Sequence, residues 1–593
     1  MSDADAELIA QVVPAIPTFA VDDGFSYSIP AGLDLSVGSV VRIPVGNRRK
    51  RGYVISVRRG DVTGLKPIAA VSSDYPAFSS SGVEVLRWIA THYVAPMSVV
   101  LAKTTPPNLP KKIRLPELED PARTPSSVHP SFTTAAANRK RTPATAILVR
   151  DELPAAIAGL LGPVVRSGRS AMVIAPTVIE ADRLGRALEA WFGNRIVITH
   201  SRLESKVRTR AWVRTAAQAG NVLVGTREGV LWPVADLGIA IAVEEERPAM
   251  KEPQTPTMHV REVLRKRATV EKFALAFVGS TASTDLLDAG VGVVATSTRL
   301  WPLVEVIDRS EEPPEGRLLS PSGTRALTHA FNSGKRLFVF AHRRGYAPAF
   351  RCVQCRAVRT CSSCEARLGR GPVCERCGYE SDACTTCKGV RFEPLGAGVE
   401  RIAEHVGRVL DIDLSEPGHE KRVSVGSEAD LAAATGVDLA LIVDADGLIA
   451  APHYRARERS LQVMVRVARL VERGRGNRLI VQTSHPLDPV IVALRRGDAS
   501  EFMLEQLAER ARLVLPPAGE VLVVETSEPT DELPNLAAER GVELFGPAPA
   551  GHGFRWLAQG RDLRAFRIGL RDVIHTWRQK GITVRVDADP RDL

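Results

Sequence analysis

The chain has 593 residues, of which 44% are hydrophobic and 25% are charged, and its formal net charge is +10. Its length predicts several domains with sizeable cores. No run of about 18 apolar residues occurs, which excludes a membrane-spanning helix. Residues 1–10 are acidic and lack the pattern of a signal peptide, so we expect a cytoplasmic protein.

The positive charge favours a polyanionic partner, with nucleic acid first among the candidates. A basic bias of the whole proteome would give the same balance, because Arg greatly outnumbers Lys and Ala is abundant, as in high-GC genomes. Charge alone therefore does not decide between these two explanations.

The N-terminal region predicts a small β domain. Residues 12–57 alternate apolar and polar side chains between Gly and Pro residues, which is typical of the strands of a barrel or sandwich, and residues 80–93 predict a short helix. A basic cluster follows Gly46-Asn47 at a predicted hairpin tip: Arg48, Arg49, Lys50 and Arg51. Such a cluster either contacts phosphate groups or is a solvated turn. We place this domain at residues 1–105 and a linker rich in Pro, Ser and Thr at residues 106–143.

From residue 144 the pattern becomes α/β. Apolar segments such as ATAILV, SAMVIAPT and LGIAIAVEEE alternate with amphipathic segments such as VIEADRLGRALEAWF, which predicts a parallel sheet covered on both faces. A second set appears in RLFVFAH, LALIVDADG and NRLIVQTS. We therefore predict a multidomain α/β fold, with a first lobe at 144–295, a second lobe at 296–350 and 390–514, a cysteine-rich insert at 351–389, and an α+β C-terminal domain at 515–593.

All eight cysteines lie in the insert as four Cys-x-x-Cys pairs: Cys352/Cys355, Cys361/Cys364, Cys374/Cys377 and Cys384/Cys387. Each pair supplies half of a tetrahedral sulfur shell, so the insert predicts two structural Zn²⁺ sites with no open coordination position. Disulfides are disfavoured, because the start of the chain does not resemble a secretory signal. Spacing alone does not decide which pairs share a metal. The inner pairs could share one ion and the outer pairs the other.

The order of these pieces resembles the bacterial primosomal protein N′ (PriA) family over nearly the whole chain. The resemblance is carried by FSYSIPAGLDLSVGSVVRIPVGNRRKRGYV, VLVGTREGVLWPVADLGIAIAVEEE, FVGSTAS, AHRRGYAP before the first cysteine pair, VDADGLIAAPHYRARERSLQVMVRVA and the terminal VRVDADPRDL. It implies a 3′-DNA-binding N-terminal domain, two RecA-like helicase lobes with two zinc ribbons in the second lobe, and a monomer. It also implies one Zn²⁺ on the outer cysteines (Cys352, Cys355, Cys384 and Cys387) and one on the inner cysteines (Cys361, Cys364, Cys374 and Cys377).

The phosphate-binding loop of such helicases, Gly-x-x-x-x-Gly-Lys-Ser/Thr, is absent. The first strand of the lobe is followed by RDELPAAIAGLL, in which Asp151 and Glu152 would repel a triphosphate. The segment GPVVRSGRS has glycines six residues apart, Arg169 in place of Lys, and a position before a strand. We interpret it as the turn between a helix and the next strand.

Three further motifs of the family are altered. The acidic Asp-Glu-Glu-His motif reads Glu244, Glu245, Glu246 and Arg247, and the loop after it has lost its aromatic residues. The arginine-finger motif reads RVARLVER at residues 466–473. The Gly-Thr-Gln motif reads VGSEADLAAATG. Asp444 and Asp446 end a buried strand, where they either cap the next helix, as we expect, or orient groups at the cleft between the lobes. Because the phosphate clamp and an arginine finger each stabilise the transition state of phosphoryl transfer, we expect no ATP hydrolysis. ATP and Mg²⁺ binding are thereby in doubt, and no catalytic or cofactor-binding residue is assigned.

Two departures bear on DNA. The family's Phe-Asp-Tyr is Phe25, Ser26 and Tyr27, which puts recognition of the 3′-terminal nucleotide in doubt, and the linker replaces a winged-helix domain. We expect a nucleoid-associated replication restart protein that binds forked, D-loop or single-stranded DNA without helicase activity. Its expected partners are primosome proteins, helicase-loading proteins and single-strand binding protein. Two alternatives remain: an active ATP-dependent 3′–5′ DNA helicase with a divergent nucleotide site, and an interaction module outside replication.

Overall fold

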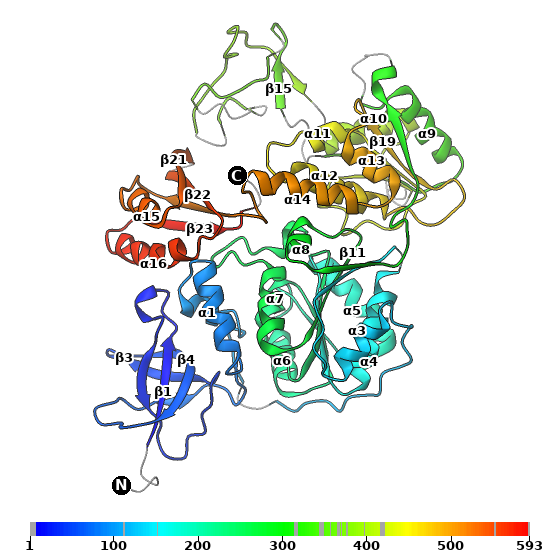
Figure 1. The fold of residues 1–593 in the computed structure, drawn as a ribbon. Coiled ribbons are helices and arrows are strands. Elements are labelled where there is room, and N and C mark those ends of the chain that lie inside the picture. Colours follow the sequence, from blue (N-terminus) through cyan, green and yellow to red (C-terminus); the bar gives the residue numbers. More distant parts are fainter. Residues whose placement is uncertain are drawn as a thin grey trace. The chain divides into compact units, whose positions relative to one another are not determined.

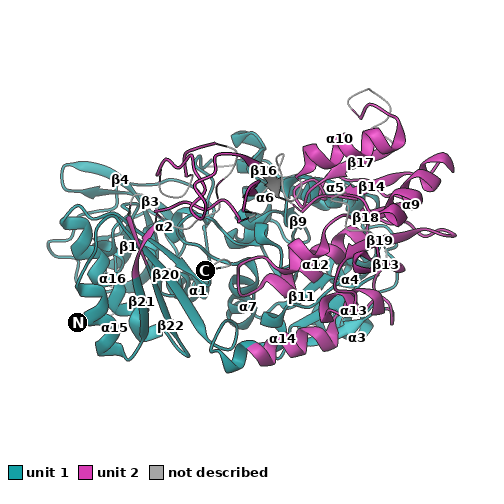
Figure 2. Cartoon of the chain, turned by 90° about the horizontal axis from the view of Figure 1, so that it is seen from above, with its two compact units in different colours: residues 1–296, 510–546, 556–590 teal, residues 297–509, 547–555, 591–593 magenta. Residues whose placement is uncertain are grey.

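The computed structural model forms two compact units, coloured separately in Figure 2. Unit 1 is built from residues up to 296 together with residues 510–546 and 556–590, and unit 2 from residues 297–509 and 547–555. The structure describes residues 7–110, 113–150, 152–312, 318–342, 349–355, 357–363, 368, 371–374, 378–395, 398–414, 422–550 and 553–590.

The chain begins with a five-stranded sheet of order β2-β1-β4-β3-β5, as the alternating sequence predicted (Figure 1). Its strands are β1 (Leu8–Pro14), β2 (Phe25–Ser28), β3 (Val40–Val45), β4 (Arg48–Arg59) and β5 (Ala70–Val71). Val45 pairs with Arg48, so Gly46 and Asn47 form the predicted hairpin turn. The sheet encloses a core that includes Val12, Tyr27 and Val54. Helices α1 (Gly82–His92) and α2 (Met97–Ala102) follow.

Residues 113–128, here called the strap, contain no helix or strand and lie along the first lobe. The amide of Ala122 donates to the carbonyl of Trp191 (2.8 Å), and Arg195 Nε donates to the carbonyl of Glu119 (2.5 Å). A Cβ atom on Gly159 would lie 2.7 Å from the carbonyl oxygen of Ser126. The strap is therefore packed tightly against the lobe at this glycine.

The first lobe is a seven-stranded sheet of order β12-β6-β11-β10-β7-β9-β8, and all of its pairings are parallel. Helices α3, α4 and α5 share a core with one face of the sheet, and Figure 1 shows α6 and α7 on the other. The strands are β6 (Thr145–Leu148), β7 (Ser170–Ile174), β8 (Ile196–Thr199), β9 (Val222–Gly225), β10 (Leu237–Val243), β11 (Ala274–Gly279) and β12 (Gly292–Ala295). The helices are α3 (Pro130–Ala137), α4 (Leu153–Arg166), α5 (Val178–Phe192), α6 (Ser205–Ala217), α7 (Val260–Glu271) and α8 (Thr284–Asp288).

Only residues 167–169 of the segment GPVVRSGRS form the expected turn before β7, because residues 162–166 still belong to α4. Gly162 is helical, and a Cβ atom there would lie 2.1 Å from Thr124 Oγ1 of the strap. The glycine therefore makes room for the strap and does not begin a turn.

The second lobe is a five-stranded parallel sheet of order β13-β19-β18-β14-β17. Helices α9 and α10 share a core with one face, and α12 contacts β18 and β19 while α13 contacts β13. The strands are β13 (Val304–Asp308), β14 (Leu337–Phe340), β17 (Val423–Gly426), β18 (Leu439–Ile442) and β19 (Arg478–Thr483). The helices are α9 (Pro321–Asn332), α10 (Val399–Leu410), α11 (Ala445–Ile449), α12 (Ala456–Ala468), α13 (Pro489–Arg496) and α14 (Ser500–Arg512).

The cysteine-rich insert interrupts the second lobe between β14 and α10, and its ends pair as β15 (Ala349–Cys352) and β16 (Phe392–Leu395). The C-terminal domain is a sheet of order β21-β22-β20-β23 with two helices. Its elements are β20 (Glu520–Thr526), α15 (Glu532–Arg540), β21 (Glu543–Ala550), β22 (Gly553–Gly560), α16 (Arg564–Gln579) and β23 (Val584–Ala588). Among the described residues, no helix combines the length and the apolar character needed to cross a membrane.

Candidate metal centre, nucleotide cleft and DNA-binding surface

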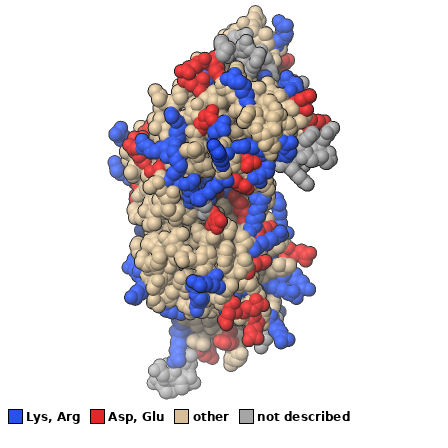
Figure 3. All heavy atoms as spheres, turned by 90° about the vertical axis from the view of Figure 1, so that its right-hand side faces the viewer, with Lys and Arg blue, Asp and Glu red and all other residues tan. Residues whose placement is uncertain are grey.

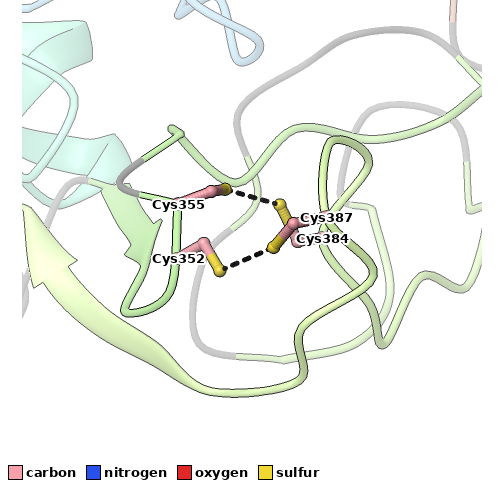
Figure 4. A group of neighbouring side chains, drawn as sticks. All are labelled: Cys352, Cys355, Cys384 and Cys387. Carbon is pink, nitrogen blue, oxygen red and sulfur yellow. Dashed lines mark hydrogen bonds between the residues drawn. The ribbon is translucent and has the colours of Figure 1, made fainter.

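The outer cysteines form one compact sulfur cluster (Figure 4). The Sγ atoms of Cys352, Cys355, Cys384 and Cys387 all lie within 4.8 Å of one another. Cys352 Sγ lies 3.5 Å from Cys387 Sγ, and Cys355 Sγ lies 3.6 Å from Cys384 Sγ. These separations are too long for disulfides, whose sulfur atoms are about 2.05 Å apart. They are close to the spacing of about 3.8 Å that tetrahedral zinc with sulfur ligands at about 2.3 Å requires. The cluster can hold one metal ion in the arrangement that the resemblance implied.

The backbone of both outer pairs is arranged to receive thiolates. Amide groups of Cys355 and Gln354 lower the pKa of Cys352, although burial opposes the shift. Amide groups of Cys387 and Thr386 similarly lower the pKa of Cys384 to about 6, again against burial. A Cys-x-x-Cys turn therefore points its own N–H groups at its first sulfur, and metal ligands must be thiolates.

Gly389 lies against the outer cysteines, although the sequence analysis did not predict a role for it. Its carbonyl accepts a hydrogen bond of 2.8 Å from the amide of Cys384. A Cβ atom at this position would lie 3.2 Å from Cys352 Sγ and 3.3 Å from Cys387 Sγ. The backbone therefore approaches the sulfur atoms so closely that a larger side chain would crowd them. The only sequence signal was a glycine two residues after the last cysteine.

The inner cysteines are described only in part. Cys361 and Cys374 are both buried and pack together with Leu368. The amide of Ser363 donates toward Cys361 Sγ (3.4 Å), as expected for a sulfur-binding turn. Cys364 and Cys377 lie outside the described residues. The structure thus brings one cysteine of each inner pair into a common core.

The place of the phosphate-binding loop is taken by a short connection between β6 and α4, residues 149–152. Glu152 stands immediately before α4 with a left-handed φ of 43°, and its side chain does not cap the helix. Asp151 lies outside the described residues. Residues 149–152 contain neither the glycines nor the lysine of a Gly-x-x-x-x-Gly-Lys-Ser/Thr loop.

The altered acidic motif follows β10, at the carboxyl end of the parallel sheet where nucleotides bind in such folds. Arg247 Nη1 lies 2.8 Å from Glu244 Oε2 and 2.6 Å from Glu180 Oε1. Glu180 belongs to the first turn of α5, where Thr177 caps the helix. The Arg247 side chain is only 6% exposed. A buried guanidinium therefore joins the first carboxylate of the motif to a carboxylate from another element.

Arg261 of α7 neutralises the second carboxylate of the motif. Its guanidinium lies 2.6 Å from Glu245 Oε2 and 2.8 Å from Asp285 Oδ1. Burial raises the pKa of Glu245, and the charge of Arg261 opposes that shift. Burial also raises the pKa of Glu246 well above its usual range, and the charges of Glu244 and Glu245 add to the shift.

The arginine-finger motif of the second lobe is likewise engaged within its own lobe. Arg466 of α12, only 9% exposed, lies 3.1 Å from Glu428 Oε1, and Arg459 lies 3.3 Å from Glu428 Oε2. Glu428 belongs to the degraded Gly-Thr-Gln segment. Asp444 caps α11 through the amide of Gly447 (2.8 Å), which confirms the expected capping role. Asp446 instead accepts a hydrogen bond from the amide of Ser484 (2.8 Å).

The basic hairpin of the N-terminal sheet is open to solvent. Arg48, Arg49 and Lys50 are exposed, whereas Arg51 is half-buried and donates to the carbonyl of Pro107 (2.8 Å). Phe25 and Ser26 are exposed on the edge strand β2, which β1 separates from the hairpin, while Tyr27 is buried and donates to the carbonyl of Pro44 (3.1 Å). Basic side chains are not confined to this domain. Figure 3, which shows the right-hand side of Figure 1, has Lys and Arg spread over the surface with Asp and Glu among them.

Comparisons with known proteins agree with this arrangement. Residues 11–106 match the family described as the 3′DNA-binding domain (3′BD) of PriA. Replication restart protein PriA of Treponema pallidum is 25% identical over 547 residues, covering 82% of each chain. PriA of Synechocystis is 26% identical over 392 residues, covering 57% of this chain and 47% of the relative. The probable PriA of Mycobacterium tuberculosis is 28% identical over 376 residues, covering 56% of each. In the last two comparisons the match therefore spans about half of the relative's length.

Two solved structures of DNA-bound helicases also match. The DUF1998 helicase MrfA bound to DNA is 12% identical with a TM-score of 0.35, covering 74% of this chain and 61% of MrfA. RecG bound to a three-way DNA junction is 10% identical with a TM-score of 0.33, covering 73% of this chain and 56% of RecG. The N-terminal match and these relatives show that the chain is similar to the replication restart protein PriA.

Proposed function

We propose that this protein binds branched or single-stranded DNA at stalled replication forks and supports primosome assembly without hydrolysing ATP. The absence of ATP hydrolysis is supported above all by the position of Arg247, which lies between Glu244 and Glu180. ATP hydrolysis in such lobes needs a carboxylate to hold Mg²⁺ and a loop to hold the phosphates. Here the first carboxylate is occupied by a buried cation of the protein itself, and the loop is replaced by the short connection before α4.

The second lobe supports the same proposal. An arginine finger must be free to reach the transferring phosphoryl group, since its charge stabilises the transition state. Arg466 is buried in an ion pair with Glu428, so it is committed to the packing of its own lobe. Loss of the phosphate loop, the metal-binding carboxylate and the arginine finger removes each main source of electrostatic stabilisation.

DNA binding rests on the 3′DNA-binding domain and its basic hairpin. Arg48, Arg49 and Lys50 stand together at the solvent-exposed turn. Exposed cations of this kind bind phosphate groups and release counterions, so affinity should fall steeply with salt. Ser26 replaces the family's Asp, and we propose that the protein binds forked or D-loop DNA with weakened selection for a free 3′ end.

We further propose that each set of cysteines holds a Zn²⁺ ion, one on the outer and one on the inner cysteines. Closed sulfur shells would stabilise the insert and take no part in chemistry. The insert would then present a rigid surface to primosome proteins, helicase-loading proteins or single-strand binding protein.

The decisive experiment measures ATP hydrolysis by zinc-loaded protein with and without a forked DNA that carries a free 3′ end, together with binding to that fork. We expect salt-dependent binding and hydrolysis at the level of a blank without protein. Turnover stimulated by the fork would instead show an active helicase with a rebuilt phosphate site. Absence of binding at physiological salt would overturn the DNA-binding proposal.

A further inference from the structure

The loop after the acidic motif, residues 248–259, makes a second set of contacts that the proposed function does not use. Within it, Lys251 is buried, and its side chain is only 6% exposed. Lys251 Nζ donates to Asp587 Oδ1 (2.6 Å), to the carbonyl of Ala588 (2.7 Å) and to the carbonyl of Asp589 (2.6 Å). An ammonium group has three N–H donors. All three are therefore occupied by the end of the last strand and the residue after it, and none is left for a phosphate group of DNA.

Further hydrogen bonds join the same loop to the C-terminal domain. The amide of Ala588 donates to Thr257 Oγ1 (3.2 Å), and Arg585 Nη2 donates to the carbonyl of Pro253 (3.4 Å). Three of these contacts use backbone groups of the C-terminal domain, namely the carbonyls of Ala588 and Asp589 and the amide of Ala588. Backbone contacts fix the position of β23 and not merely of its side chains.

The loop also contacts the N-terminal domain. Lys103 Nζ lies 3.3 Å from Glu252 Oε2, and the amide of His259 donates to the Tyr93 hydroxyl (3.1 Å). Asp589 in turn lies 3.1 Å from His92 Nε2 at the end of α1 and 3.7 Å from Arg567 Nη2 of α16. Burial would raise the pKa of Asp589, but the hydrogen bond and charge of His92, with Arg567 and Lys251, hold it well below its usual range. Three domains thus meet at one polar junction.

We propose that Lys251 is a positioning residue that holds the N-terminal and C-terminal domains against the first lobe, so that DNA meets a surface that is already assembled. The loop that lost its aromatic residues has become a brace between domains. Fixing two binding surfaces in advance removes the ordering cost of bringing them together on the ligand. This inference rests on the DNA-binding function proposed above.

The test compares Lys251→Met with Lys266→Met in the full-length, zinc-loaded protein. Lys266 of α7 also joins the first lobe to another domain, through Glu84 of α1 at 2.6 Å, but the Glu84 side chain is 64% exposed. Exposed ion pairs contribute little. Asp587→Asn is a second variant that weakens the same brace from the opposite side while leaving Lys251 in place. Hydrogen exchange reports on β23, and fluorescence anisotropy with a forked DNA reports affinity over a series of salt concentrations.

We expect Lys251→Met to speed amide exchange in β23 by about 10-fold or more and to weaken fork binding by about 10-fold, as expected when two surfaces are no longer held together. The slope of log affinity against log salt should not change, because Lys251 contacts no phosphate. Asp587→Asn should act in the same direction but less strongly, and Lys266→Met should resemble the unmodified protein.

Three outcomes would overturn the inference. Unchanged exchange in β23 would show that Lys251 does not hold the C-terminal domain. A salt slope reduced by about one unit would make Lys251 a direct phosphate contact. Normal fork affinity despite faster exchange would show that the brace does not serve DNA binding. If the unmodified protein failed to bind the fork, the proposed function would be wrong. Hydrogen exchange in β23 would still test separately whether Lys251 holds the C-terminal domain in place.

Discussion

Two clusters of potential metal ligands in this molecule differ in what neutralises them. In the insert, four cysteine sulfur atoms face one another within 4.8 Å. In the first lobe, Glu244 and Glu245 of the acidic motif face the arginines Arg247 and Arg261. The sulfur cluster can take up a cation, whereas the carboxylates of the acidic motif are already paired with two cationic side chains of the chain itself. Ligand type and spacing alone therefore do not make a metal site; the surrounding charges decide.

The largest expected effect comes from breaking the sulfur cluster. Replacing Cys352 with Ser removes one ligand, and zinc sites of this kind contribute on the order of 10–16 kcal/mol to folding. We expect bound zinc, measured by atomic absorption, to fall by one equivalent and exchange to increase around the outer cysteines. Ser362→Ala, at an exposed position of the same insert, is the matched control. Unchanged zinc content would contradict the outer pairing, and loss of both equivalents would contradict two separate sites.

A gentler change at the same cluster is Gly389→Val. Its side chain would crowd Cys352 and Cys387, since even a Cβ atom would lie 3.2 Å from the first sulfur. We expect a weaker site, seen as faster zinc release to a chelator. Gly371→Ala is the control, because a Cβ atom there has no neighbour within 4 Å. Equal release rates for the two variants would mean that the backbone approach at Gly389 is not needed.

The acidic motif can be tested by removing the cation that pairs with its first carboxylate. Arg247→Ala leaves Glu244 and Glu180 without their shared partner, and breaking a buried ion pair costs about 3 kcal/mol. We expect a lower melting temperature that Mn²⁺ partly restores, and Mn²⁺ binding detectable by electron paramagnetic resonance. Arg265→Ala is the control, since Arg265 is 34% exposed and pairs with Glu262 of its own helix. A melting temperature that does not respond to Mn²⁺ would show that the carboxylates cannot form a site even when freed.

The smallest effect concerns Glu246, whose pKa is raised by burial and by its acidic neighbours. A carboxyl group with a raised pKa in the folded state contributes stability that is lost as pH rises from its unfolded pKa through its folded pKa. Glu246→Gln removes this loss, so we expect it to stabilise the protein by about 1 kcal/mol at pH 8 and less at pH 5. Thermal unfolding at both pH values checks this expectation. A variant that is less stable at pH 8 would show that the negative charge is used.

The sequence predicted the lobes well because their signals are local. The segment VIEADRLGRALEAWF coincides with α5, whose first turn is capped by Thr177. The last helix, α16, begins at Arg564 and contains Gly569. Gly569 weakened the helical signal there, yet a Cβ atom at this position would lie 2.6 Å from Leu536, so the glycine serves packing against α15. Gly162 in α4 illustrates the same point. In a sequence, a glycine indicates a turn. At these two helical positions the glycine is instead required by a close neighbour that only tertiary packing brings near.

The cysteine ligands and the absence of a phosphate-loop pattern can both be read from short stretches of sequence. Cys-x-x-Cys turns are local, so the outer cluster could be expected from spacing and resemblance, and the absent phosphate loop could be seen directly. The pairing partners of the buried charged side chains, in contrast, follow from tertiary packing. Arg247 meets Glu180 across 67 residues of chain, and Lys251 meets Asp587 across 336. Such contacts leave no periodic or spacing signal, because they arise when separately formed elements pack and a buried charge must find a partner. That packing gave the acidic motif its own cations and made the loop beside it a brace.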